Sequence, residues 1–299
     1  MVFGTGAIGG YYGGMLAQSG ADVSFIARGN NYNVLCKKGL TIITEENKIT
    51  FPVKVFNSTK GLGKFDYVFI CVKSFDTKST LDEIKENIGP QTTIASLQNG
   101  IENEELIIKS FGKEKVIGAF VYIASQLIEP GIVKVLGNKR GMIGELNGAI
   151  TSRVEELHNM FKIANVDFAI SENILGDMWD KLVWNVSFNP TSVATGKTVD
   201  KLLEEDYDLV KNIMTEVKNV AIANGIKIRL DTVEFNLERT KGYKGFKTSM
   251  LQDFERGKSL EVDAILGVVL RKAKEKNVPV PNIEKLYEQL KTKLCKPCS

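Results

Sequence analysis

One lysine and one amide share a face of a predicted helix in an otherwise apolar segment. Residues 179–190 place the amine of Lys181 and the amide of Asn185 one helical turn apart. An ammonium beside hydrogen-bonding amides in a poorly solvated site can donate a proton to a developing alkoxide. The alternative is a lysine that reaches solvent from a buried helix, with Asn185 bonded to nearby backbone.

A glycine-rich turn near the amino terminus predicts a dinucleotide site. Its glycines permit a tight turn, a close approach of backbone to a pyrophosphate, and close packing of helix on strand. A predicted helix over residues 10–20 and a predicted strand over residues 23–27 follow the turn, as a strand–turn–helix–strand unit requires. The residues of the turn are Gly4, Thr5, Gly6, Ala7, Ile8 and Gly9.

The end of the second predicted strand indicates which cofactor binds. NAD-binding units usually carry an acidic residue there, about twenty residues after the glycines, which holds the ribose 2′-hydroxyl. This chain carries Arg28 instead, and a cation fits a 2′-phosphate. NADP(H) is therefore the expected cofactor. The alternative is that Arg28 is only an exposed loop cation.

Length and composition favour a cytoplasmic enzyme of two domains. The 299 residues exceed one typical domain. Lysine and arginine number 39 against 36 acidic residues, and the net charge of +3 is too even to imply nucleic acid. No apolar run approaches a membrane span, and no leader precedes the first predicted strand. We expect a monomer or homodimer that acts on a small molecule, with no nucleic-acid or membrane partner.

Cysteine and histidine usage argues against a metal centre. Cys295 and Cys298 have a metal-like spacing, but no second pair accompanies them, and His158 is the only histidine. We therefore expect no bound metal and a reducing compartment. With one histidine on an ordinary predicted helix, acid–base work falls to a lysine or a carboxylate.

Hydrophobic periodicity divides the chain near residue 170. Upstream, strands alternate with helices, which predicts an open α/β sheet, parallel at first and extended by antiparallel strands. From Ile174 onward the pattern is helical, and the prolines of residues 278–281 precede a final amphipathic helix. We predict a Rossmann-type dinucleotide-binding domain over residues 1–172 and an all-helical substrate and catalytic domain over residues 173–299. The strands expected after residue 60 are 67–72, 92–97, 115–119, 132–136, 141–143 and 166–170.

Two polar residues follow predicted strands directly. Lys73 comes after the apolar residues 69–72, and Asn99 comes after residues 94–97. Because ligands of such sheets meet the carboxyl ends of the strands, Lys73 is placed to approach the cofactor, and Asn99 to bond the nicotinamide or the substrate. The alternatives are a solvated lysine and an ordinary Asn-Gly turn.

Taken together, these motifs resemble the ketopantoate reductase (2-dehydropantoate 2-reductase) family along nearly the whole chain. The ordered set is more specific than any single motif, and it includes two runs in the helical half. The matching segments are residues 4–9, Arg28, 71–73, 98–100, 181–185 with 189–190, 249–253 and 257–263.

The resemblance implies NADPH-dependent reduction of 2-dehydropantoate to pantoate, a step toward pantothenate and coenzyme A. By position, Lys181 would be the general acid, and Glu261 would hold the substrate hydroxyl and orient the site. The resemblance also assigns the substrate to Asn185, Asn189 and Ser249, and the cofactor side to Asn99 and Lys73. The alternatives are that Glu261 is an acid in the first turn of a helix and that Ser249 is a simple cap.

Two departures from the family pattern bear on the substrate. Leu266 stands where family members often have asparagine, and residues 198–200 offer no amide where some members bind substrate. Either change favours an alternative function, reduction of another branched or aromatic 2-oxoacid. A hypothesis of another class is a non-catalytic NADP(H) sensor, which would need the glycine turn and Arg28 but not Lys181 with Glu261.

Overall fold

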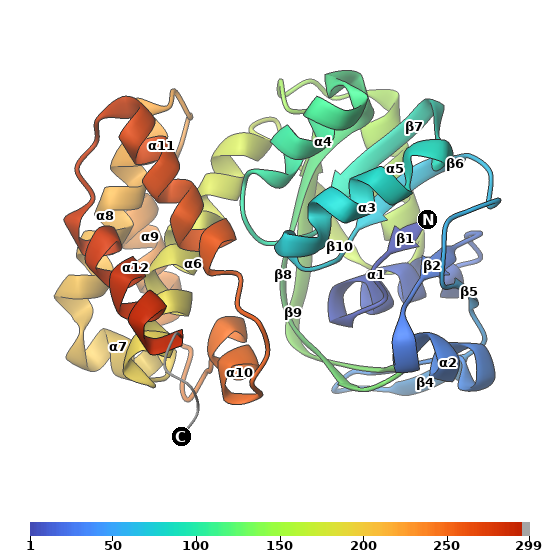
Figure 1. Ribbon diagram of the computed structural model, residues 1–299, viewed down its shortest axis with the longest axis horizontal. Coiled ribbons are helices and arrows are strands. Elements are labelled where there is room, and N and C mark those ends of the chain that lie inside the picture. Colours follow the sequence, from blue (N-terminus) through green and yellow to red (C-terminus); the bar gives the residue numbers. More distant parts are fainter. Residues whose placement is uncertain (295–299) are drawn as a thin grey trace. The chain divides into compact units, whose positions relative to one another are not determined.

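The computed structural model describes residues 1–294 and separates into two compact units (Figure 1). The first unit comprises Met1–Asn99 and Asn103–Ile174, and the second comprises Gly100–Glu102 and the chain from Leu175 onward. Every described strand belongs to the first unit, and the second is helical. The predicted order of an α/β domain followed by a helical domain is therefore confirmed.

Six parallel strands build the part of the sheet that carries the glycine turn. Their spatial order is β5-β2-β1-β6-β7-β8, which is the strand order of a dinucleotide-binding sheet. The strands are β1 (Val2–Phe3), β2 (Ser24–Ile26), β5 (Lys54–Phe56), β6 (Phe65–Ile70), β7 (Ile88–Ser96) and β8 (Val116–Glu129).

Four further strands extend the sheet beyond β8. Strand β9 (Ile132–Gly144) runs antiparallel to β8 and pairs in parallel with both β10 (Asp167–Ile170) and β3 (Leu40–Ile43), whose outer neighbour is β4 (Lys48–Phe51). The antiparallel extension agrees with the prediction. Strand β9 is continuous where the sequence predicts two strands, because a shift in its register with β8 lets the ladder resume after Gly137.

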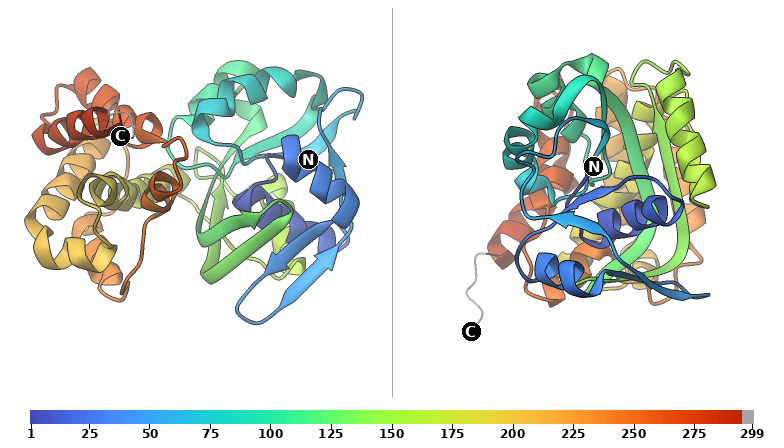
Figure 2. Two further views of the ribbon diagram at one scale, coloured as in Figure 1. Left: turned by 60° about the horizontal axis from the view of Figure 1, so that its bottom comes forward. Right: turned by 90° about the vertical axis from the view of Figure 1, so that its right-hand side faces the viewer.

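Helices cover both faces of this sheet (Figure 2). Alternate residues of one strand point to opposite faces, so Val2 packs with α1 (Ala7–Gln18) and α5 (Ser152–Ile163). The next residue, Phe3, packs on the other face with α3 (Thr77–Glu83) and α4 (Asn103–Phe111). The same alternation in β2 and β6 makes their apolar runs nearly continuous, as a strand buried on both faces requires.

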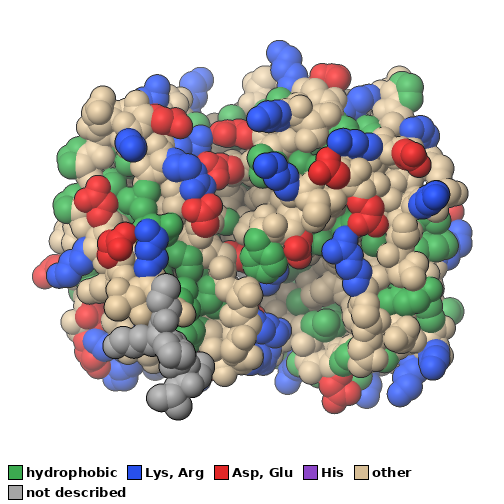
Figure 3. Space-filling view, viewed as in Figure 1, with side chains coloured by type: hydrophobic (Ala, Val, Ile, Leu, Met, Phe, Trp, Pro, Cys, Tyr) green, Lys and Arg blue, Asp and Glu red, His purple; other side chains and the backbone are tan. Residues whose placement is uncertain are grey.

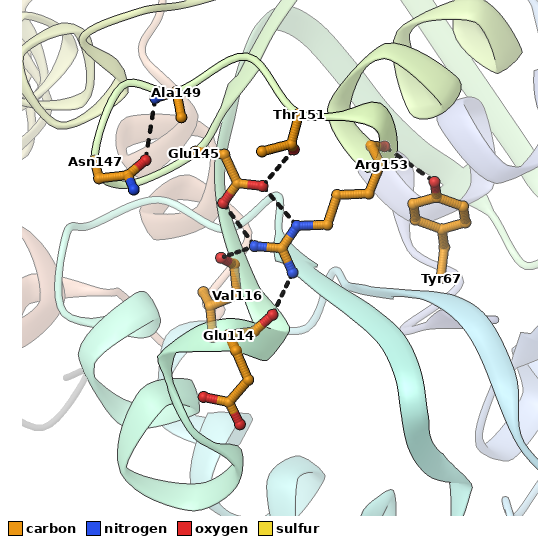
Figure 4. Close-up of polar contacts among 8 residues, drawn as sticks. All are labelled: Tyr67, Glu114, Val116, Glu145, Asn147, Ala149, Thr151 and Arg153. Carbon is orange, nitrogen blue, oxygen red and sulfur yellow. Dashed lines mark hydrogen bonds and ion pairs between the residues drawn. The ribbon is translucent and has the colours of Figure 1, made fainter.

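A buried ion pair joins three segments of the first unit (Figure 4). Nε and Nη2 of Arg153 each donate to a carboxylate oxygen of Glu145 over 2.6 Å, and the Thr151 hydroxyl donates to the same group over 2.6 Å. Arg153 also bonds the backbone carbonyls of Glu114 and Val116, at the start of β8. Burial opposes ionisation of Glu145, but the hydrogen bonds from Arg153 and Thr151 outweigh it and lower the pKa of this carboxyl.

Helix α8 is the central helix of the second unit. It contacts four other helices, and the longest helix, α6, also runs through this unit (Figure 1). Helix α11 ends at Lys276 and α12 begins at Pro281, where the prolines predict a new helix. The helices are α6 (Ile174–Thr195), α7 (Val199–Glu205), α8 (Tyr207–Ala223), α9 (Thr232–Thr240), α10 (Ser249–Glu255), α11 (Val268–Lys276) and α12 (Pro281–Leu294).

Basic and acidic side chains are interspersed on the face shown in Figure 3, in agreement with the nearly equal numbers of basic and acidic residues in the sequence. Within residues 1–294, no helix has the length and apolar character needed to cross a membrane. The same residues contain no group of three or more His, Cys, Asp or Glu side chains arranged to hold a metal ion. Cys295 and Cys298 lie outside the described residues.

Candidate active site

The glycine turn is hydrogen-bonded to the end of β2. The backbone N–H groups of Gly4 and Thr5 each donate to the carbonyl of Ile26 over 3.1 Å, and the Thr5 hydroxyl donates to it over 2.9 Å. Gly4 has φ of +101°, a value that side chains other than glycine rarely tolerate. A Cβ added to Gly9 would collide with the Gly4 carbonyl oxygen, so the turn and α1 pack too closely for any larger residue.

The other side of this turn has room for a ligand. No atom lies within 4 Å of the position that a Cβ on Gly6 would take. Gly6 is also the residue before α1, and no side chain caps that helix end. The first-turn N–H groups of a helix have no partners within the helix, so those of Ala7 and Ile8 suit an anion. The turn therefore fits the pyrophosphate of a dinucleotide.

Arg28 lies just beyond the carboxyl end of β2 and directly precedes α2 (Gly29–Lys38). Its side chain is 57% exposed and pairs with Glu83 of α3, with 2.8 Å between Nη2 and Oε2. The guanidinium also lies over the ring of Phe3, 5.7 Å from its centroid. The structure thus places a cation where the sequence predicts one, beside an acid that no local motif identifies, since Glu83 is 55 residues away.

Lys73 and Asn99 follow the ends of neighbouring parallel strands. Ile70 of β6 lies opposite Ser96 of β7, so the residues that follow them meet at one edge of the sheet. Gln98 connects the two strand ends, because its amide nitrogen donates to the Val72 carbonyl over 2.9 Å and its amide oxygen accepts from the Ser96 hydroxyl over 3.0 Å. Gln98 is a positioning residue that sequence reasoning missed.

In the second unit, α6 aligns three polar residues along one face. Lys181, Asn185 and Asn189 follow one another at intervals of four, and the last two are 6% and 2% exposed. Both amides are therefore largely removed from water. The Ser249 hydroxyl, at the start of α10, lies 3.5 Å from the amide oxygen of Asn189.

The amine of Lys181 has an unusual electrostatic environment. Its pKa is lowered to about 8, because burial and, to a smaller extent, the positive charge of Arg239 outweigh the opposing negative charge of Glu261. Glu261 is 8% exposed, so this carboxylate is also largely removed from water. The structure therefore brings together Lys181 and Glu261, which are 80 residues apart in the sequence.

Arg239 is the second residue that sequence reasoning missed. Its Nε donates to the Asn236 amide oxygen over 2.9 Å, and Thr240 accepts a 2.9 Å hydrogen bond from the indole of Trp184. The first of these bonds lies within α9, and the second joins α9 to the part of α6 that carries Lys181. No motif marks Arg239, because its relation to Lys181 depends on how two separate helices pack.

Trp184 and Trp179, the only tryptophans, stand on α6 on either side of Lys181. Trp179 is 3% exposed, whereas Trp184 is half-buried. Trp184 also packs against Phe188, with 4.9 Å between ring centroids, and against Tyr243 at 6.3 Å. Aromatic rings therefore border the polar face of α6.

A π-helical turn over Asp263–Gly267 begins two residues after Glu261. Arg271 clamps this turn, since Nη1 donates to Asp263 over 2.8 Å and Nη2 donates to Glu102 over 2.6 Å. A Cβ on Gly267 would lie 2.2 Å from the Asp263 carboxylate, so a larger residue there would displace this side chain from its present position in the ion pair. Wider π turns of this kind often occur at functional sites.

The two residues that depart from the family pattern are core residues here. Leu266, within the π turn, and Val199, at the start of α7, are both 0% exposed. Each therefore fills apolar space where an amide would need a hydrogen-bond partner.

Two family models cover most of the chain. The model described as ketopantoate reductase PanE/ApbA matches residues 1–148, and its C-terminal counterpart matches residues 173–294. A 2-dehydropantoate 2-reductase of Nostoc sp. is 32% identical over 97% of this chain and 93% of its own length. These matches identify the chain as an oxidoreductase of a class that uses a nicotinamide dinucleotide. More particularly, it belongs to the ketopantoate reductase family, which confirms the resemblance seen in the sequence.

Solved structures agree with this membership. The 2-dehydropantoate 2-reductase of Geobacter metallireducens GS-15 has a TM-score of 0.92 and 34% identity, covering 98% of this chain and all of its own. A D-mandelate dehydrogenase, solved with NADH and anilino(oxo)acetate, has a TM-score of 0.89 at 22% identity, with 98% of both chains covered. The second likeness shows the fold alone, so this fold also serves a protein named for a different hydroxy acid.

Proposed function

We propose that this chain is an NADPH-dependent 2-dehydropantoate 2-reductase, which reduces the ketone of 2-dehydropantoate to the alcohol of pantoate in pantothenate and coenzyme A biosynthesis. The observation that carries the proposal is the poorly solvated amine of Lys181, under the electrostatic influence of the Glu261 carboxylate, on a helix face that also presents Asn185 and Asn189. Relatives that cover most of this chain bear the same enzyme name.

The first unit would hold the dinucleotide. Residues Gly4 to Gly9 supply the tight turn, the open position at Gly6 and the helix N-terminus that suit a pyrophosphate. Arg28 would pair with the 2′-phosphate, while Lys73 and Asn99 would contact the cofactor from the ends of β6 and β7. When bound, NADPH supplies a hydride to the ketone carbon.

Lys181 would supply the proton. As the hydride arrives at carbon, negative charge develops on the ketone oxygen, and Nζ of Lys181 donates a proton to that oxygen to complete the alcohol. A pKa of about 8 keeps the amine mostly protonated at neutral pH while making its proton easier to release than that of an ordinary lysine. The reaction leaves a neutral amine, which regains a proton from solvent.

The remaining polar residues would select the substrate. Glu261 would accept a hydrogen bond from the hydroxyl of 2-dehydropantoate, and Asn185, Asn189 and Ser249 would bind its other oxygens. Asn99 is a further candidate for substrate binding. Support comes from the proximity of Ser249 to Asn189 and from the burial of Asn185 on the same helix face. An analogue without the hydroxyl would deprive the buried Glu261 carboxylate of this hydrogen bond.

Steady-state kinetics with NADPH and a panel of 2-oxoacids test this proposal. We expect kcat/KM for 2-dehydropantoate to exceed that for 2-oxoisovalerate, which lacks the hydroxymethyl arm, by about 10²-fold or more. Glu261→Ala should shrink that ratio, whereas Glu255→Ala, an exposed acid on α10, should preserve it. NADPH binding without turnover of any 2-oxoacid would instead indicate a sensor.

A second candidate function is reduction of another branched or aromatic 2-oxoacid. The apolar Leu266 favours it, because this side chain takes a position where family members often have an amide. The aromatic border formed by Trp184 and Tyr243 also suits a larger apolar substrate. Comparable kcat/KM values for 2-dehydropantoate and an aromatic 2-oxoacid would establish this function and reject the first.

A further inference from the structure

The ion pair of Arg28 and Glu83 has unequal partners. Glu83 is the last residue of α3, and its backbone carbonyl accepts a 2.9 Å hydrogen bond from the buried Thr59 hydroxyl. The Glu83 side chain is 27% exposed, against 57% for Arg28. The Glu83 carboxylate therefore lies at a helix end that is hydrogen-bonded to Thr59. The more exposed Arg28 side chain extends over the ring of Phe3 to reach it.

This arrangement changes what a 2′-phosphate meets at Arg28. A guanidinium has five N–H donors, so it can bind a phosphate while one edge still contacts a carboxylate. The phosphate and Glu83 would then be two anions on one cation, and their repulsion would weaken binding. If Arg28 leaves Glu83 instead, the ion pair is lost. A ribose 2′-hydroxyl carries no charge and incurs neither cost.

We propose that Glu83 is a coenzyme-selectivity residue, which competes with the 2′-phosphate of NADPH for Arg28 and so narrows the preference for NADPH over NADH. This inference rests on the proposed use of NADPH, but it adds a residue from α3 that opposes that preference. Selectivity would then depend on the Arg28–Glu83 pair and not on Arg28 alone.

Direct binding tests the inference without any substrate. The Kd values of NADPH and NADH are measured by titrating nicotinamide fluorescence for the unmodified protein and for Glu83→Gln. Glutamine keeps the shape and a hydrogen-bond acceptor but removes the charge. We expect the Kd of NADPH to fall about two- to fivefold, the range that an exposed ion pair accounts for, and the Kd of NADH to stay unchanged. Glu86→Gln, the same change three residues further on, should alter neither value.

A second variant separates competition for Arg28 from simple repulsion. In an Arg28→Ala background, Glu83→Gln should no longer tighten NADPH, because nothing remains to compete for. The inference would be overturned if Glu83→Gln lowered the Kd of NADPH equally in that background. It would also be overturned if the unmodified protein bound NADPH tightly and Glu83→Gln left that Kd unchanged. An unmodified protein that binds neither dinucleotide would overturn the proposed function, and the inference would fall with it.

Discussion

Lys181 combines two influences that act on its charge in opposite directions. Burial and the positive charge of Arg239 favour the neutral amine, whereas the carboxylate of Glu261 favours the ammonium. Their balance leaves a pKa of about 8, between that of a free lysine and neutrality. General acids work best when their pKa lies near the working pH. The local environment of this residue therefore matches the role that we propose for it.

Replacing Lys181 should affect catalysis far more than cofactor binding. We expect Lys181→Ala to lower kcat by about 10²–10⁴-fold, because the ketone oxygen loses its proton donor, while the Kd of NADPH stays unchanged. Stopped-flow and equilibrium titration measure the two quantities. Lys201→Ala, on the exposed surface of α7, is the matched control. Near-normal turnover by Lys181→Ala would remove this residue from the mechanism.

The same residue predicts how reduction depends on pH. The ammonium is the active form, so kcat/KM should be constant well below pH 8 and should decline as the pH rises through about 8. Because the charge of Arg239 lowers the pKa of Lys181, Arg239→Met should move the decline to higher pH. Arg229→Met, which removes an exposed cation elsewhere on the second unit, should leave it in place. A profile that Arg239→Met does not shift would contradict the electrostatic coupling.

At the residue scale, local patterns in the sequence identify what lies within one element. The one-turn spacing of Lys181 and Asn185 places both on one face of α6, and the glycines of residues 4–9 form the expected turn. Contacts between distant elements leave no such pattern. Glu83 beside Arg28, and Arg239 beside Lys181, depend on how helices pack, so only the structure reveals them.

At the scale of elements, one ion pair secures several chain segments at once. Arg153, in the first turn of α5, bonds Glu145, which follows β9, and the carbonyls of Glu114, just before β8, and Val116, its first residue. Strand β8 contributes to both parts of the sheet, since it pairs with β7 at one end and with β9 along most of its length. The cluster therefore stabilises the junction between the parallel strands and their antiparallel extension.

Removing the arginine should destabilise this junction. We expect Arg153→Met to reduce the free energy of unfolding at pH 7 by about 2–4 kcal/mol, because Glu145 would remain buried without its cation. The pKa of Glu145 lies below its ordinary value of 4.5, so its contribution is present above that value and is lost as the pH falls through the lower, folded-state pKa. The difference in unfolding free energy between Arg153→Met and the unmodified protein should therefore become smaller at acid pH. Urea denaturation measures both effects.

An exposed residue of the same helix provides the comparison for Arg153. Lys162→Met removes a positive charge near the other end of α5, where the side chain faces solvent. Its effect should stay within about 0.5 kcal/mol. Equal losses in the two variants would show that the cluster contributes nothing specific.

Periodicity in the sequence locates some strands well and others poorly. Strands β2, β6 and β10 lie within two residues of their predicted positions, whereas β8 begins as predicted but continues to Glu129, ten residues beyond its predicted end. Strands β3, β4 and β5 were not predicted. Each has only three or four residues, and exposed polar residues such as Lys48 and Lys54 interrupt the apolar alternation that marks a strand.

At the scale of the whole molecule, the candidate site residues are divided between the two units. The strand-containing unit carries the glycine turn, Arg28, Lys73 and Asn99. The helical unit carries Lys181, Glu261 and the other polar side chains of α6 and α10. The shift from alternating strands and helices to continuous helical periodicity predicts this order from the sequence. The pairing of particular residues within each unit does not follow from it.

Binding of the dinucleotide should stabilise one unit selectively. With NADPH at 100 times its Kd, we expect about 2.7 kcal/mol of added stability, since the ligand binds only the folded turn. Hydrogen exchange should slow in α1 and β2, whereas α8 and α12 should exchange at their former rates. Slowing confined to the helical unit would contradict the assignment of the dinucleotide to the glycine turn.

The placement of both tryptophans on α6 gives this protein a built-in optical probe. Because Trp179 and Trp184 are its only indoles, its whole tryptophan emission comes from the helix that carries Lys181. The buried Trp179 should emit at short wavelength and change little. The indole of Trp184 is half-buried and hydrogen-bonded to Thr240, so its emission responds when water beside the polar face of α6 is displaced. Occupancy of that face is therefore observable without a label, even in a variant that no longer turns over.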